Sequence, residues 1–304
     1  MRIQSILIGA AVAALVVLPA RAAEGWVNGQ WQTYDAQKLD IENSVGTVKI
    51  DVKDSGPMAV QISGLPERVK GVKVFVSNSG KLHIKGEEIG TVWDWRHWFD
   101  FSRGNINRPD KLVINVVVPR GSPVAVEENA GNVTIGDTMG PVKFEANGYT
   151  RSTIGNVTEA RLEMAGSGKL KVGNVTGRVR ADTAGSGNMQ IGDVGSINAD
   201  IAGSGSITVG RVNGPIKVDI AGSGDFSAAS VNGPAKADIA GSGSVTIASG
   251  EADPFKVDIM GSGNVSFGGT AVNPHVSAMG SGSVKIKSYR GSLKNDGAKL
   301  TIGN

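Results

Sequence analysis

Acidic side chains recur through the second half of the chain at an almost constant spacing. Seven aligned positions carry a carboxylate: Glu145, Glu163, Asp182, Asp200, Asp219, Asp238 and Asp258. Six of the positions two residues earlier are basic: Lys143, Arg161, Arg180, Lys217, Lys236 and Lys256. Residues two apart in a β-strand share one face, and stacked carboxylates repel by roughly 1 kcal/mol per pair in water. The pattern predicts a solvated face on which the bases compensate the acids. The alternative is a cation-binding column, although the Gly-Gly-x-Gly-x-Asp spacing of calcium-binding repeats is absent.

Serine recurs as well, at the centre of a Gly-Ser-Gly element. The positions are Ser167, Ser186, Ser204, Ser223, Ser242, Ser262 and Ser281. A serine nucleophile needs a neighbouring base, but His83, His97 and His275 are far apart, and only His275 lies in the repeats, at a position of the basic series. We therefore predict that the serines satisfy hydrogen bonds of turns, and we expect no catalytic residue.

A third group of residues is aromatic. Segment 92–101 contains three of the five tryptophans and two of the seven phenylalanines. Its candidate partner-binding residues are Trp93, Trp95, Arg96, Trp98, Phe99 and Phe101. Two interpretations stay open: a plug over one end or flank of the fold, or a contact site for a partner protein, glycan or lipid surface, because Trp and Arg are frequent in interaction hot spots. His97 with Asp94 and Asp100 lacks a cysteine or second histidine nearby, so we predict no metal site and no cofactor.

These residues are positioned by a repeat of about 19 residues. Successive Gly-Ser-Gly copies are separated by 19, 18, 19, 19, 20 and 19 residues, a period typical of a solenoid. Apolar residues alternate with polar ones at 207/209 and at 216/218/220, which predicts two short strands per copy with one buried face. Gly-Ser-Gly would form one corner and Asn-Gly-Pro (213–215 and 232–234) the other, with its glycine at positive φ. Identical turns once per copy favour parallel stacking, so we predict an all-β, right-handed parallel β-helix.

Composition divides the chain into four parts. Residues 1–22 have the features of a signal peptide, with an apolar run followed by small residues before Ala23. Residues 23–127 lack the period but contain alternating runs at 39–42, 48–52, 60–62, 72–74, 82–84 and 112–118, which predict an irregular N-terminal β region, with the aromatic insertion at 92–101, that begins and caps the solenoid. Residues 128–289 hold the solenoid repeats. Residues 290–304 form a C-terminal tail or a last strand at 299–302.

Charge and cysteine content exclude several classes of function. The chain has no cysteine, so neither a disulfide framework nor a lipoprotein attachment site exists. Without residues 1–22 it has 29 basic and 28 acidic residues, which gives no electrostatic basis for binding nucleic acid. We expect no transmembrane span in the mature form and an exported location, in the periplasm or at the cell surface or outside the cell.

The chain resembles the adhesin-like head domains of secreted bacterial proteins, the GIN-domain family with repeats of the DUF2807 and DUF4097 types. The resemblance rests on the Gly-Ser-Gly repeats with their short following strands, on Val-Val-Val-Pro-Arg-Gly at 116–121, and on the segment 268–284 that ends in Met-Gly-Ser-Gly-Ser-Val. It covers about residues 36–287. It implies a right-handed β-helix of the cell envelope and provides no catalytic residues to transfer to this sequence.

Two classes of function follow from these features. The first, which we favour, is an exported non-catalytic β-solenoid with an adhesin-like, envelope-structural or ligand-binding role, with an envelope protein or glycan as partner. The second is a β-helix enzyme acting on polysaccharide, which needs carboxylates clustered across rungs in a groove lined by aromatics. Weak end-to-end self-association through the rod ends is a further option.

Overall fold

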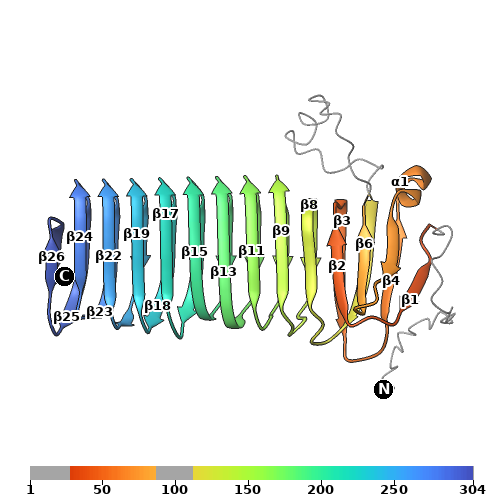
Figure 1. Ribbon diagram of the computed structural model, residues 1–304, viewed down its shortest axis with the longest axis horizontal. Coiled ribbons are helices and arrows are strands. Elements are labelled where there is room, and N and C mark those ends of the chain that lie inside the picture. The colour runs from red at the N-terminus through yellow and green to blue at the C-terminus, as the bar shows by residue number, and fades with distance from the viewer. Residues whose placement is uncertain (1–27, 87–111, 304) are drawn as a thin grey trace, which may run out of the picture.

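The computed structural model describes residues 28–86 and 112–303. It is almost entirely β, with 69% strand and 2% helix, and forms a parallel β-solenoid of about nine turns of roughly 19 residues. Figure 1 shows the turns, here called rungs, stacked side by side into a straight rod. The predicted parallel β-helix is thereby confirmed. No helix in the described part of the chain has the length and apolar character needed to cross a bilayer.

Each rung contributes one strand to a long face of the rod. The strands of this face are β9 (Val142–Gly148), β11 (Ala160–Gly166), β13 (Val175–Gly185), β15 (Val194–Gly203), β17 (Ile216–Gly222), β19 (Ala235–Gly241), β22 (Phe255–Gly261), β24 (His275–Gly280) and β26 (Lys294–Asp296). Neighbours pair in parallel with equivalent residues opposite one another, as Asp200 with Asp219. The regular register therefore places each repeat position in one column along the rod.

The second face follows the same plan. Its strands are β10 (Arg151–Ile154), β12 (Lys169–Val172), β14 (Asn188–Ile191), β16 (Ser206–Val212), β18 (Asp225–Asn232), β20 (Ser244–Ile247), β23 (Asn264–Val272), β25 (Ser283–Arg290) and β27 (Lys299–Ile302). A narrow third side lies between the two faces. It is formed by the start of β15, by the ends of β16, β18, β23 and β25, and by the short β21 (Gly250–Ala252).

Alternation of side chains builds the core. Ile216, Val218 and Ile220 point inward and are at most 2% exposed, while Lys217 and Asp219 between them point outward. The interior is filled mainly by Val, Ile and Ala, with Phe144, Phe226, Phe255 and Phe267 as its largest members. Phe255 and Phe267 stack with ring centroids 5.1 Å apart. A single rung could not bury these side chains, so the core exists only because rungs stack.

The Gly-Ser-Gly corners need glycine for two separate reasons. The first glycine has positive φ in every copy, for example +118° at Gly203. A Cβ there would lie 2.5 Å from the carbonyl oxygen of Gly185 in the preceding rung. That carbonyl accepts a hydrogen bond from the backbone N–H of Ser204 at 2.9 Å. The close approach of the rungs therefore leaves no room for a side chain.

The Asn-Gly-Pro corners correct one expectation. Gly233 has the predicted positive φ of +147°, but Gly214 does not have a positive φ. Glycine at 214 is required instead because a Cβ would lie 2.7 Å from the carbonyl oxygen of Gly195. Steric proximity between rungs, rather than backbone conformation, explains this residue.

Side chains also link rungs, at the turn where the second face ends. Asp137 Oδ1 accepts a hydrogen bond from the backbone N–H of Asn156, and Asn156 Oδ1 accepts one from Asn174. Asn174 and Asp193 continue the series, which ends at the N–H of Arg211. Each of the four acceptor residues directly follows a glycine, and successive acceptors are 18 or 19 residues apart. This repeat was not predicted from the sequence.

The N-terminal rungs stack out of sequence order. β2 (Lys38–Glu42) and β3 (Val45–Lys53) form one rung, and β6 (Lys81–Lys85) and β7 (Leu112–Pro119) form another. The β2–β3 rung lies between the β6–β7 rung and β8 (Val124–Ile135), which joins both faces of the solenoid. Four of the six strands expected in residues 23–127 lie in these two rungs.

Antiparallel strands cover the N-terminal end of the rod. β4 (Met58–Ser63) pairs with β7, β1 (Trp31–Tyr34) pairs with β4, and β5 (Lys73–Val76) pairs with β6. The short helix α1 (Pro66–Lys70) buries Val69 against this end. At the opposite end β26 and β27 form the last described rung, as Figure 1 shows, and the expected strand at 299–302 is confirmed. Self-association through the rod ends stays a prediction.

We expect Gly203→Ala to destabilise the rod by about 2 kcal/mol, because it introduces both an unfavourable φ and a contact with the Gly185 carbonyl. Denaturant unfolding followed by circular dichroism measures the effect. Ser204→Ala is the control: its side chain is exposed at the same corner, so its midpoint should match that of the wild type. Equal midpoints for Gly203→Ala and wild type would contradict the steric account.

Candidate functional site: the charged long face and its trough

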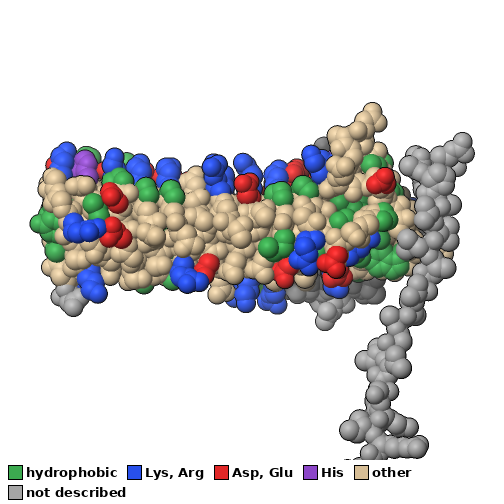
Figure 2. Space-filling view, turned by 90° about the horizontal axis from the view of Figure 1, so that it is seen from below, with side chains coloured by type: hydrophobic (Ala, Val, Ile, Leu, Met, Phe, Trp, Pro, Cys, Tyr) green, Lys and Arg blue, Asp and Glu red, His purple; other side chains and the backbone are tan. Residues whose placement is uncertain are grey.

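The predicted columns of charge are present on the long face. The register aligns the seven carboxylates from Glu145 to Asp258. It also aligns the basic residues from Lys143 to Lys256, followed by His275. Figure 2 shows Lys and Arg side chains in a row along one long edge of the rod. We call these series the acid column and the basic column.

Ion pairs connect the two columns within a rung. Arg161 pairs with Glu163 at 2.6 Å and Arg180 with Asp182 at 2.8 Å. Lys217 and Lys236 pair in the same way with Asp219 and Asp238. The expectation that bases compensate the stacked acids is confirmed in these four rungs, whereas Lys143 pairs with Glu127 instead of Glu145.

In one rung the base itself is replaced, because Asn198 occupies its position. The carboxylate of that rung, Asp200, is reached by Arg180 of the preceding rung at 3.1 Å. The Asn198 amide oxygen is buried and has no hydrogen-bond partner among the described residues. The acid column therefore has one member without a base of its own rung.

The carboxyls of Asp200 and Asp219, which lie in neighbouring rungs, have pKa values shifted in opposite directions. Burial raises the pKa of Asp200 to about 6, and the carboxyls of Asp182 and Asp219 add to the shift. Burial also raises the pKa of Asp219, but hydrogen bonds with Lys217 and with the carboxyls of Asp238 and Asp200 outweigh it, so its pKa lies below the usual value. Of these two carboxyls, Asp200 therefore takes up its proton at the higher pH.

A groove of about 690 Å³ runs beside the acid column. Exposed alanines occupy the outward position two residues after five of the seven acids: Ala165, Ala184, Ala202, Ala221 and Ala240. Asn147 and Met260 take this position after Glu145 and Asp258, and the carboxylates of the acid column line the groove as well. Six rung steps of about 4.8 Å make the acid edge about 29 Å long. We call this groove the acid trough.

Two carboxylates that line the acid trough have unused hydrogen-bonding capacity. Asp182 Oδ1 and Asp238 Oδ1 are buried and accept no hydrogen bond from the described residues. Buried acceptors without donors are costly. Rotation of these carboxylates toward the trough would let a ligand with hydroxyl or amine donors satisfy them.

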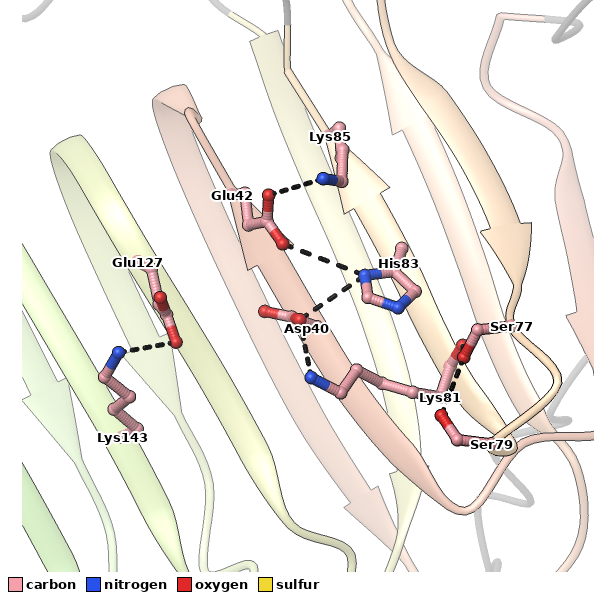
Figure 3. Close-up of polar contacts among 9 residues, drawn as sticks. All are labelled: Asp40, Glu42, Ser77, Ser79, Lys81, His83, Lys85, Glu127 and Lys143. Atoms are coloured by element: carbon pink, nitrogen blue, oxygen red, sulfur yellow. Dashed lines mark hydrogen bonds and ion pairs between the residues drawn. The ribbon is translucent and has the colours of Figure 1, made fainter.

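A second polar group lies near the N-terminal end, on β2 and β6. Asp40 is directly opposite His83 in the parallel register, and Glu42 is opposite Lys85. Figure 3 shows the His83 ring facing both carboxylates, with Nδ1 3.3 Å from Asp40 Oδ2 and 3.8 Å from Glu42 Oε1. Lys81 and Lys85 also pair with these carboxylates. The bond from Lys85 holds the pKa of Glu42 below its usual value, although burial opposes it.

The other residues that the sequence offered as candidate sites have different outcomes. The six aromatic-segment candidates and His97 lie outside the described residues, as does the predicted signal peptide. The seven corner serines form a column, but all are exposed. Their backbone N–H groups make the corner hydrogen bonds, which corrects the expectation that the hydroxyls do so. The pair Asp40 and His83 was missed, because its residues are 43 positions apart and only strand order brings them together.

We expect Asp200→Asn to raise the thermal midpoint at pH 7.5. The folded state binds this proton more tightly than the unfolded state does, so the stability that Asp200 contributes is lost as the pH rises through about 6. The increase in the thermal midpoint should be smaller at pH 5.0. Asp219→Asn is the matched control and should lower the midpoint at both pH values, because it removes the partner of Lys217. Destabilisation by Asp200→Asn at pH 7.5 would contradict the assignment.

Comparison with known proteins finds similar crystal structures and one matching family model. Three crystal structures match most of the chain: a "putative adhesin" from Parabacteroides distasonis (16% identity, TM-score 0.46, 88% of this chain and 96% of that one), a "putative lipid binding protein" from the same organism (17%, 0.47, 87% and 97%), and a "putative adhesin" from Bacteroides fragilis (14%, 0.36, 88% and 95%). No curated protein matches the chain.

A family model gives the assignment. The model described as "Putative auto-transporter adhesin, head GIN domain" matches residues 40–247 and again residues 217–292. The two matches overlap, as expected for a repeat that can be aligned in more than one register. Together they extend from β2 to the rung of β25. The chain therefore belongs to the auto-transporter adhesin head family, the GIN-domain family.

Proposed function

We propose that the protein is an exported, non-catalytic adhesin-like rod that holds an extended envelope glycan in the acid trough. The observation that carries the proposal is the trough itself, in which the buried acceptors of Asp182 and Asp238 lack donors among the described residues. Membership of the adhesin head family and the predicted signal peptide support export and an envelope role.

The shape and chemistry of the trough suit a linear chain of sugars. The alanine methyl groups leave the floor shallow, so a ligand can lie along the rod rather than enter a closed pocket. Carboxylate oxygens accept hydrogen bonds from hydroxyl groups, and the rungs offer such acceptors at a constant interval. A regular ligand would gain contacts in proportion to its length, which is the physical basis of multivalent attachment.

A protein partner is a second candidate, favoured by two methionines. Met260 and Met279 continue the alanine column toward the C-terminal end and are 62% and 73% exposed. Flexible methionines on a surface adapt to apolar groups of different shape. The aromatic segment at 92–101 stays a predicted contact site for the same class of partner.

Trough binding is tested with the mature protein on isolated envelope fractions and a glycan array. The double variant Ala202→Arg and Ala221→Arg fills two adjacent rungs of the trough and should weaken binding at least tenfold. Gln190→Arg with Thr208→Arg is the matched control, because it adds the same charges to adjacent rungs of the second face and should bind normally.

A third variant separates the trough from the aromatic segment. If Trp93→Ala, Trp95→Ala and Trp98→Ala together abolish binding with the β-sheet spectrum intact, while the trough variant binds normally, the trough proposal is wrong and the aromatic segment is the contact site. Loss of binding only to protein components would favour the second candidate.

Polysaccharide hydrolysis is the remaining alternative, and the pair Asp200 and Asp219 favours it. Neighbouring carboxyls with separated pKa values can act as acid and nucleophile. We expect no release of reducing sugar or unsaturated product from a panel of uronates and glucans, because the pair belongs to a regular column with ion-paired members. Turnover that disappears in Asp200→Asn would establish an enzyme instead.

A further inference from the structure

We infer that Asp40, Glu42 and His83 form a binding site for a zinc-class divalent cation. The site lies on the outward face of β2 and β6 and is separate from the acid trough, so it goes beyond the proposed function. One atom from each residue, a carboxylate oxygen or an imidazole nitrogen, lies within 4.8 Å of the other two. Figure 3 shows the three side chains converging from two neighbouring strands.

The distances are close to those that a metal ion requires. Zinc lies about 2.0–2.2 Å from nitrogen and oxygen ligands, so two ligands of a tetrahedral site are about 3.3–3.6 Å apart. His83 Nδ1 is 3.3 Å from Asp40 Oδ2 and 3.8 Å from Glu42 Oε1. Small side-chain movements would bring all three atoms to one ion, and water would fill the open coordination position.

Unused hydrogen-bonding capacity is the second, independent observation. Asp40 is only 4% exposed, yet its Oδ1 has no hydrogen-bond partner among the described residues. His83 Nδ1 is also buried and makes no hydrogen bond, although it faces two carboxylates. The Asp40 oxygen that faces His83 is Oδ2, which is shared with Lys81, so the buried Nδ1 of His83 is the atom of this group whose bonding a metal ion would complete.

The surrounding residues hold the ligands in place. Phe75 stacks on the His83 ring with centroids 4.9 Å apart and planes at 14°, which fixes the plane of the imidazole. Asp40 and His83 are direct neighbours across two paired strands, so their backbones cannot separate. Rigid support of this kind positions ligands before the metal arrives.

Two lysines balance the charge of the carboxylates without a metal. Lys81 Nζ is 3.0 Å from Asp40 Oδ2, and Lys85 Nζ is 2.8 Å from Glu42 Oε2. The lysine side chains are 37% and 41% exposed, whereas those of Asp40 and Glu42 are 6% and 27% exposed. A buried carboxylate needs a compensating charge, and a bound cation would supply it in place of the lysine. The lysines can therefore move into water when the cation binds. The proposal thus predicts competition between lysine and metal.

The imidazole nitrogen sets the preference among cations. Nitrogen ligands favour zinc and its neighbours in the periodic table, whereas calcium and magnesium prefer oxygen alone. Two carboxylates with one histidine should bind Zn²⁺ or Co²⁺ in preference to Ca²⁺.

Metal binding is tested on the full chain after treatment with a chelator, by titration calorimetry with Zn²⁺ and by the visible absorption of Co²⁺. We expect one equivalent to bind. His83→Ala and Asp40→Asn should each weaken binding at least tenfold, with the circular dichroism spectrum unchanged. Lys81→Gln should tighten binding several-fold, because it removes the competing ammonium group, whereas a structural role for Lys81 predicts no such gain.

Two control variants and a competition with Ca²⁺ decide the assignment. His275→Ala removes an exposed histidine that lies 3.1 Å from Asp296 at the other end of the rod and should leave binding unchanged. His97→Ala should do the same. Equal Zn²⁺ affinity in wild type and His83→Ala, loss of binding in His97→Ala, or displacement of Zn²⁺ by equimolar Ca²⁺ would each overturn the proposal.

Discussion

Every rung must approach its neighbour closely enough for backbone hydrogen bonds along the whole rod, and most other features follow from that distance. At about 4.8 Å between strands, corners carry glycine because a Cβ at Gly203 or Gly214 would overlap a carbonyl of the rung before it. In the series from Asp137 to Asp193, each side-chain oxygen accepts a hydrogen bond from a backbone N–H of the next turn. Interior side chains, mainly Val, Ile and Ala, lie against the equivalent residues of the neighbouring rungs.

Regular stacking also places like charges on top of one another. The rod tolerates seven stacked carboxylates because a base two residues earlier pairs with most of them. Where Asn198 replaces that base, the pKa of Asp200 rises to about 6, with burial as its main cause. The same periodicity creates the acid trough, since alanine at the next outward position leaves a continuous depression beside the acids. Scaffold and candidate binding surface are thus products of one repeat.

The N-terminal end obeys the same pairing rule but loses the sequence order. Because β2 lies between β6 and β8, residues from two separate parts of the chain share one outward face. Antiparallel β1, β4 and β5 then cover strands that would otherwise present free edges. The polar group of Asp40, Glu42 and His83 exists only because of this rearrangement. A repeat that simply continued to the end could not have produced it.

Periodicity in the amino-acid sequence was sufficient to predict the parallel solenoid, both charge columns and the glycine corners, since each repeat position has one place in a regular stack. The N-terminal strands were also predictable, from their alternation. Their spatial order was not, and neither were the contact of Asp40 with His83, the trough or the pKa of Asp200. Alternation reports which face of a strand is buried, but it carries no information about which distant strand pairs with it. Pairing across 43 residues depends on how whole rungs fit together, and the ionisation of a carboxyl depends on the burial and charges that this fit creates.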